Sequence, residues 1–146
     1  MKILLDTNIV LDYLGANEGF TDEAEAVLDL ADGNNLFEFV SASAVTDIYY
    51  VLKRALKDRE LVKEKFSQFR EKIGILPVSA KDIDTAFLRD WKDFEDAVQY
   101  TVAESNGVDY IVTRNVKDFE ENTIPVLTPV DFIELIKEQL NNKQTQ

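Results

Sequence analysis

Short apolar runs alternate along the chain with longer segments in which apolar residues recur every three or four positions. Apolar runs of about four to eight residues are typical of buried strands, and the three-to-four spacing is typical of helices that pack on them. The pattern predicts strands at 2–6, 36–40, 75–78, 108–113 and 124–127. It predicts helices at 9–14, 21–33, 41–56, 60–73, 80–88, 93–105 and 128–140.

This alternation of strands and helices predicts the fold class. Parallel neighbouring strands need a crossover connection, and a helix between successive strands provides one. We therefore expect an α/β fold, a three-layer α/β/α sandwich with a central, mostly parallel sheet. A chain of 146 residues is long enough to bury one hydrophobic core, and it contains no repeat or linker that would indicate a second domain. We assign a single domain to residues 1–140 and a frayed polar tail to residues 141–146.

The composition narrows the chemistry, because the chain has no cysteine and no histidine. Disulfides, thiol nucleophiles, zinc-thiolate sites, imidazole ligands and Ser-His mechanisms are all excluded. The remaining oxygen ligands suit hard cations such as Mg²⁺ or Mn²⁺. The apolar runs are too short to span a bilayer, and Asp6 and Asn8 interrupt the N-terminal one. We expect no membrane span, no signal peptide and a cytoplasmic location.

Four aspartates, Asp6, Asp47, Asp96 and Asp118, follow or flank apolar runs far apart in the chain. In an open parallel sheet, ligands bind beyond the carboxyl ends of the strands, where Asp6 ends the first one. Asp47 and Asp96 fall in early helical turns, from which a side chain can lean toward the same edge. Carboxylates brought together there would repel one another unless a cation or a proton neutralised them. The pattern predicts a metal site.

Each of these aspartates also has a purely structural interpretation. Asp6 and Asp118 can cap turns, and Asp47 can cap a helix or face solvent. Asp96 lies in the crowded acidic run DFED, which is typical of a solvated helix face. The joint pattern favours the metal site, because every one of the four would otherwise need a separate local reason for its position.

The charge of the chain is unevenly distributed. A net charge of −12 argues against broad coating of nucleic acid, which needs a basic surface. Yet eight of the sixteen cationic residues lie between Lys53 and Lys72, beside four acidic ones, and give that segment a local charge of +4. The segment is either a pair of solvated helices with mixed charges or a local site that steers phosphate groups.

Four segments in order, LLDTNIVLDYL, SASAVTDIYYVLKR, DFEDAVQYTVAESNGVDYIVTRNVKDF and PVDFIELI, resemble the PIN domain family. The resemblance covers nearly the whole chain; DTN alone is not specific, but the ordered set is. It extends to the bacterial and archaeal PIN proteins that include toxins of toxin-antitoxin pairs. It implies a metal-dependent endoribonuclease that binds Mg²⁺ or Mn²⁺, cleaves an RNA substrate and pairs with an antitoxin protein.

The resemblance also assigns the acidic site. Asp6 matches the first acid of the family motif, and Asp96 matches the late acid that precedes an alanine. Asp47 stands where the family usually has glutamate, so we expect its shorter side chain to reach the metal through water. Asn115 occupies the fourth acidic position without a charge, and Asp118 can substitute for it. We therefore expect Asp6, Asp47, Asp96 and Asp118 to be catalytic and, with Asn115, to be the metal ligands.

Polar and cationic neighbours complete this predicted site. Asn8 and Thr113 are expected to hydrogen bond to the ligands or the phosphate, although Asn8 can also merely cap a helix and Thr113 merely end a strand. Arg114, Lys53 and Arg54 are candidate contacts to the RNA backbone.

Other functions remain open. A catalytically inactive PIN-like module that binds RNA or protein is consistent with the amide at Asn115. A phosphatase-like fold would have a second aspartate two residues after Asp6, but this chain has Asn8 there. A receiver-like fold would have a phosphoacceptor aspartate at the end of its middle strand, but Val78 and Ser79 stand there instead. Four aromatic residues suggest a homodimer interface, unless they belong to the core: Tyr49, Tyr50, Phe66 and Phe69.

Overall fold

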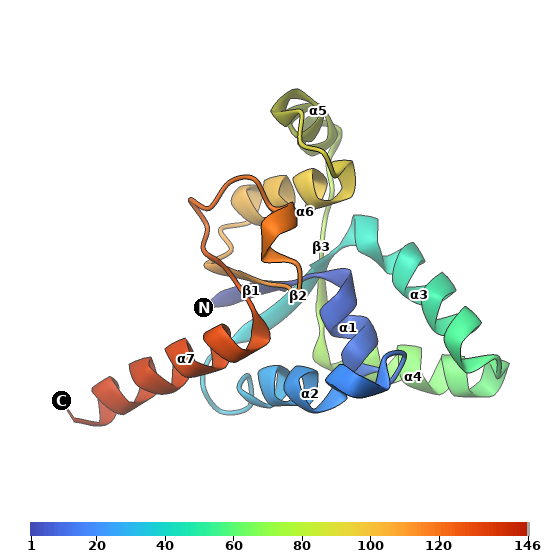
Figure 1. The fold of residues 1–146 in the computed structure, drawn as a ribbon, viewed down its shortest axis with the longest axis horizontal. Helices are drawn as coiled ribbons and strands as arrows, with labels where there is room; N and C mark the ends of the chain where they lie inside the picture. Colours follow the sequence, from blue (N-terminus) through green and yellow to red (C-terminus); the bar gives the residue numbers. More distant parts are fainter. Residues whose placement is uncertain (146) are drawn as a thin grey trace.

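The computed structural model describes residues 1–145 and contains one sheet of parallel strands with helices on both faces (Figure 1). The strands are β1 (Lys2–Leu5), β2 (Phe37–Ser41), β3 (Gly74–Leu76), β4 (Tyr110–Val112) and β5 (Val126–Leu127), in the order β3-β2-β1-β4-β5. The α-helices are α1 (Thr7–Tyr13), α2 (Thr21–Asp29), α3 (Ala42–Leu56), α4 (Arg59–Lys72), α5 (Ala80–Arg89), α6 (Phe94–Ser105) and α7 (Pro129–Gln144). Two 3₁₀ turns, η1 (Glu18–Phe20) and η2 (Val116–Asp118), were not predicted. The predicted three-layer fold is confirmed.

The two helical layers follow from the alternation of side chains along the strands. Ile3 and Leu5 of β1 pack in the core with α1, α2, α3, α4 and α7, whereas Leu4 packs in the core with α5 and α6. Successive residues of a strand point to opposite faces. All three side chains are fully buried. Because helices cover both faces of the sheet, its strands are continuous apolar runs. These runs were the signal by which the strands were predicted from the sequence.

β1 lies at the point where the strand order reverses. The chain first adds β2 and β3 on one side of β1 and then returns to the other side with β4 and β5. β1 therefore pairs with both β2 and β4. In parallel sheets this reversal opens a crevice beyond the carboxyl ends of the two strands. Asp6 directly follows β1 and Thr113 directly follows β4, so both lie at that crevice.

The C-terminal helix corrects one prediction. The helix expected to end at Leu140 runs to Gln144, so most of the segment predicted to be a frayed tail is helical. Leu140 packs against the larger core and anchors the helix up to that point. The next turn then continues the existing hydrogen-bonding pattern, which needs no new nucleation.

The aromatic residues proposed for a homodimer interface do not share one environment. Phe69 is fully buried in the core and Phe66 is half-buried, whereas Tyr49 and Tyr50 are exposed. A homodimer therefore stays a prediction, and Phe69 has a core role instead. Within residues 1–145, no helix has both the length and the apolar character that crossing a membrane requires.

Glu38 is an acidic side chain buried within this apolar framework. It lies on β2 with 5% of its surface exposed. Neither of its carboxylate oxygens has a hydrogen-bond partner among residues 1–145. Burial raises the pKa of Glu38 to about 8, and the nearby Asp32 adds to this shift while Lys72 opposes it. Glu38 is therefore mostly protonated at neutral pH.

We expect Glu38→Met to stabilise the protein, and more strongly at pH 8 than at pH 4. Between pH 4.5 and 8 the unfolded chain releases the Glu38 proton while the folded protein retains it, so the stability of the wild type falls as pH rises. Replacing a buried, unpartnered carboxyl group by an apolar side chain should raise the free energy of unfolding by about 1–3 kcal/mol near pH 8. Urea unfolding at several pH values measures this. An equal effect of Glu64→Met, at an exposed glutamate, would contradict it.

Candidate active site

A cleft of about 490 Å³ lies beyond the carboxyl ends of β1 and β4, and six carboxylates line it. They come from the end of β1, from α3, from the start of α6 and from η2. The predicted residues Asp6, Asp47, Asp96, Asn115 and Asp118 all lie around this one cleft. The full lining is Asp6, Thr7, Asn8, Leu11, Asn17, Asp47, Val51, Asp93, Glu95, Asp96, Asn115 and Asp118.

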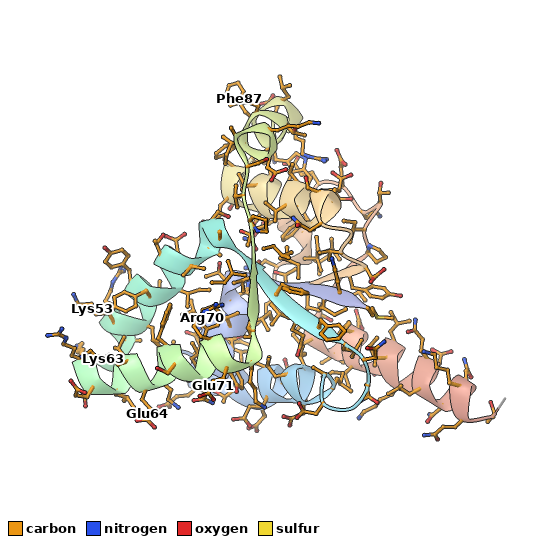
Figure 2. All side chains as sticks on the ribbon, turned by 180° about the vertical axis from the view of Figure 1, so that it is seen from behind. Lys53, Lys63, Glu64, Arg70, Glu71 and Phe87 are labelled. Carbon is orange, nitrogen blue, oxygen red and sulfur yellow. The ribbon has the colours of Figure 1, made fainter. Side chains whose placement is uncertain are left out.

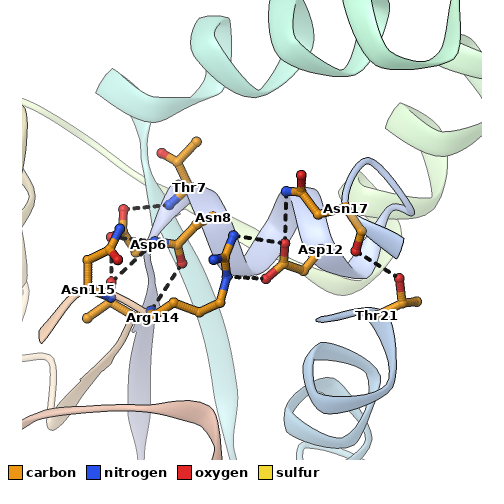
Figure 3. Close-up of polar contacts among 9 residues, drawn as sticks. Asp6, Thr7, Asn8, Asp12, Asn17, Thr21, Arg114 and Asn115 are labelled. Atoms are coloured by element: carbon orange, nitrogen blue, oxygen red, sulfur yellow. Dashed lines mark hydrogen bonds and ion pairs between the residues drawn. The ribbon is translucent and has the colours of Figure 1, made fainter. Parts of the chain in front are cut away.

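Asp6 accepts hydrogen bonds from three residues in distant parts of the fold, and Figure 3 shows the contact with Thr7. Its Oδ1 accepts hydrogen bonds from the backbone amide of Thr7, at 2.7 Å, and from Nε2 of Gln99 on α6, at 3.1 Å. Its Oδ2 accepts one from Oγ1 of Thr113, after β4, at 2.7 Å. With only 6% of its surface exposed, this carboxylate is oriented by protein donors rather than by solvent.

Thr113 and Asn8 organise the loop beyond β4. Oγ1 of Thr113 donates to Asp6 and accepts from the backbone amide of Asn115, at 3.0 Å. Oδ1 of Asn8 accepts from the backbone amide of Arg114, at 3.3 Å. Two side chains therefore tie the loop 113–115 to the first helix, and the position of Asn115 at the cleft depends on them.

Asp96 and Glu95 lie in the first turn of α6, whose N-cap is Asp93. Burial raises the pKa of Asp96 to about 8, and the negative charge of Asp6 adds to the shift. Burial also raises the pKa of Glu95 to about 7, with Asp47 the next cause. The cleft thus crowds carboxyl groups so closely that Asp96 and Glu95 retain protons to a higher pH than usual, and its described lining residues include no cationic side chain.

The donor chemistry of the cleft fits a hard divalent cation. Its side-chain donors are carboxylate, amide and hydroxyl oxygens, which are the ligands that Mg²⁺ and Mn²⁺ prefer. Within residues 1–145, however, no group of three acidic side chains is already arranged so that it could hold a metal ion. Asp6 and Asp96 are buried, whereas Asp47, Asn115 and Asp118 are exposed. The fixed part of the cleft is therefore the Asp6–Asp96 corner.

Two further site residues, Glu95 and Gln99, are not predicted by the sequence pattern. Glu95 belongs to the crowded acidic run DFED, which alone does not single it out, and it lines the cleft. Gln99 is fully buried and donates to Asp6, at 3.1 Å, and to Asp96, at 3.5 Å, and so links the two acids. Its spacing of three residues from Asp96 places both on one side of α6. That spacing was the available signal, but it does not show that the face is buried.

The three predicted RNA contacts lie outside the cleft lining. Lys53 and Arg54 are exposed in the last turn of α3. Arg114 is engaged: its Nε donates to Oδ2 of Asp12 at 2.7 Å, and its guanidinium carbon lies 4.0 Å from the centre of the Phe20 ring. Nδ2 of Asn17 also donates to Asp12, at 2.9 Å. Asp12, with 1% of its side chain exposed, thus fixes Arg114 beside the cleft (Figure 3).

A family model described as "PIN domain" matches residues 2–117, which include every cleft residue except Asp118. The chain belongs to the PIN domain family. A similar protein, Ribonuclease VapC1 of Aquifex aeolicus (strain VF5), is 30% identical over 145 residues; the match covers 91% of this chain and 94% of that protein.

Solved structures share the fold of this PIN domain. VapBC2 from Rickettsia felis, bound to a DNA fragment from their promoter, has a chain that is 20% identical with a TM-score of 0.66; the match covers 87% of this chain and 97% of that one. The Mycobacterium tuberculosis VapC20, a Sarcin-Ricin loop cleaving toxin, is 16% identical with a TM-score of 0.59, over 75% of this chain and 86% of that one. At these identities the structures establish the fold alone.

We expect Asp12→Asn to destabilise the PIN domain by about 2–3 kcal/mol, because it leaves the partly buried guanidinium of Arg114 without its charged partner. Thermal unfolding followed by circular dichroism measures this as a lower Tm. Asp22→Asn, the same change at an exposed aspartate of α2, is the control. Equal Tm values for the two variants would show that the Asp12–Arg114 pair contributes nothing.

Proposed function

We propose that this PIN domain is a metal-dependent endoribonuclease. The observation that carries the proposal is the pair of buried acids, Asp6 and Asp96, linked by Gln99 in a cleft lined by six carboxylates. A related protein, 30% identical over nearly its full length, is named a ribonuclease. The absence of histidine and cysteine leaves carboxylates and a metal ion to perform acid-base chemistry.

Asp6 and Asp96 would hold Mg²⁺ or Mn²⁺, and Asp47, Asp118 and Asn115 would contribute from the exposed side of the cleft. When bound, the ion lowers the pKa of a water molecule and neutralises the charge that develops on the scissile phosphate. Glu95 faces the same cleft and is a further candidate ligand. The choice between Asn115 and Asp118 for the fourth position stays open, because both line the cleft.

The side chains of the chain have separate tasks in this proposal. Thr113 and Gln99 keep Asp6 in one orientation, and Asn8 holds the loop that carries Asn115. The carboxylates orient the attacking water in line with the leaving oxygen. Water then adds to phosphorus, the bond from phosphorus to the 3′ oxygen breaks, and the products carry a 5′-phosphate and a 3′-hydroxyl.

We further propose that the protein acts as the toxin of a toxin-antitoxin pair in the cytoplasm. Support comes from the family and from relatives: one similar solved structure is described as a toxin-antitoxin complex from Klebsiella pneumoniae, at 22% identity and a TM-score of 0.63. An antitoxin protein is the partner that this proposal implies. Homodimer formation is a separate proposal, which size-exclusion chromatography with light scattering tests.

Asp6→Asn and Asp96→Asn should each lower RNA cleavage by roughly 10²-fold or more, because each removes a carboxylate that would ligate the metal ion. Cleavage of a labelled RNA in Mg²⁺, in Mn²⁺ and in EDTA measures this, with Asp84→Asn on α5 as the control at an exposed position. Cleavage should stop in EDTA. If the wild type cuts no RNA with either ion, the inactive binding module becomes the better interpretation.

Thr113→Val should lower cleavage by about 10–100-fold, as expected when a partner behind a metal ligand is lost. Valine has the shape of threonine but cannot donate to Oδ2 of Asp6. Thr113→Ser, which keeps the hydroxyl group, should retain most of the activity. Equal rates for the valine and serine variants, measured with folded proteins in the same assay, would show that this hydrogen bond does not matter for the reaction.

A further inference from the structure

α3 and α4 extend away from the sheet and meet at a tip, which places much of the basic segment of the chain outside the core (Figure 1). Lys53, Arg54, Lys57 and Arg59 are all exposed there. Among residues 1–145, none of these four forms an ion pair with a carboxylate. Unpaired cations in a protein of net charge −12 are available to an anionic ligand.

One of these cations, Arg54, lies on the side of α3 that leads from the acidic cleft. Asp47 and Val51 of α3 line the cleft, and Arg54 follows them at helical spacing. Residues three, four and seven positions apart lie along one side of a helix, so the side that begins at Asp47 leads directly to Arg54. At 1.5 Å per residue, the distance along the helix axis from Asp47 to Arg54 is about 10 Å.

The cations at the tip surround a hollow. A cavity of about 270 Å³ lies between the end of α3 and the start of α4. Its lining is Tyr49, Lys53, Lys57, Asp58, Arg59 and Val62. Figure 2 shows Lys53 near this outer end of α3. Three cationic side chains therefore border the hollow, against one acidic residue that is already engaged as the N-cap of α4.

An exposed aromatic ring lies between the cleft and the tip. Tyr50 has 60% of its surface exposed. Its ring lies nearly perpendicular to that of Tyr49, with centroids 6.0 Å apart, and Tyr49 in turn packs on Phe66, with centroids 5.7 Å apart. This contact supports the Tyr50 ring from one side. Exposed aromatic rings interleaved with cations are the features that bind single strands, through base stacking and phosphate contacts.

We propose that Tyr50, Lys53, Arg54 and Lys57, here called the α3 tract, bind the single-stranded RNA that flanks the scissile bond. The inference rests on the proposed function, because it takes the cleft as the place of cleavage. The charge of the tract indicates which ligand it binds. Three cations without ion-pair partners beside one exposed aromatic ring suit a polyanion better than an apolar protein surface. Arg114 is not part of the tract, since Asp12 and Phe20 hold its guanidinium.

The test measures RNA binding without cleavage. Fluorescence anisotropy of a labelled single strand of about 12 nucleotides, a length within known site sizes, is recorded with Asp6→Asn protein in EDTA at several salt concentrations. The combined change Lys53→Ala, Arg54→Ala and Lys57→Ala should reduce the slope of log K against log salt by about 2, since each phosphate contact to a single strand contributes roughly 0.7. The control removes three exposed lysines elsewhere: Lys81, Lys137 and Lys143.

Tyr50 provides an independent measurement. Tyr50→Ala should weaken RNA binding by about five-fold or more through loss of base stacking, whereas Tyr50→Phe should bind as the parent does. Equal salt slopes for the tract variant and the lysine control would overturn the proposal, as would equal binding by Tyr50→Ala and Tyr50→Phe. Equal salt slopes are also the result expected if the α3 tract binds a protein instead of RNA. RNA cleavage by the wild-type protein tests the proposed function separately, so the two failures can be told apart.

Discussion

The orientation of one buried carboxylate, that of Asp6, links the elements that form the cleft. Thr7 of α1, Gln99 of α6 and Thr113 after β4 all donate to it. Thr7 and Gln99 belong to helices on opposite faces of the sheet, and Thr113 belongs to the loop that follows β4. The parallel sheet places the carboxyl ends of β1 and β4 side by side, so their following residues must share one space. The hydrogen bonds to Asp6 offset the free energy of burying its carboxylate, which an unpartnered polar group in the same place would not recover.

Much of the fold could be predicted from the sequence, because its strands and helices differ in their hydrophobic period. The runs at 2–6 and 36–40 are buried on both faces and correspond closely to β1 and β2. The runs at 108–113 and 124–127 are longer than β4 and β5, since Val108 and Ile124 are buried in the core without joining the ladder. Apolar runs therefore predicted most of the buried segments, although Phe37 in one run and Phe87 and Leu88 on α5 are exposed. They could not separate a strand from the buried loop next to it.

The site was predictable only in part, for a different physical reason. The spacing of acids around apolar runs placed Asp6, Asp47, Asp96 and Asp118 at one cleft. It could not show that Gln99 turns inward, because a helix with apolar residues on most sides gives no clear polar face. It also could not show that Arg114 pairs with Asp12, which lies 102 positions away in the chain. Such contacts depend on tertiary packing, and local sequence carries little information about them.

The acids of the cleft that were predicted from the sequence divide into two groups that differ in burial. Asp6 and Asp96 are buried, and Gln99 bridges them, so their positions are set by packing. Asp47 and Asp118 are exposed, and few contacts restrict their side chains. Because no three acids among residues 1–145 are already arranged around an ion, the proposed metal would have to draw in exposed side chains or complete its shell with water and RNA oxygens. Mg²⁺ retains several waters and substrate phosphates in many sites. On this basis, metal and RNA should bind to the cleft cooperatively. The RNA phosphate would supply oxygen ligands to the metal, and the metal would supply positive charge to the phosphate.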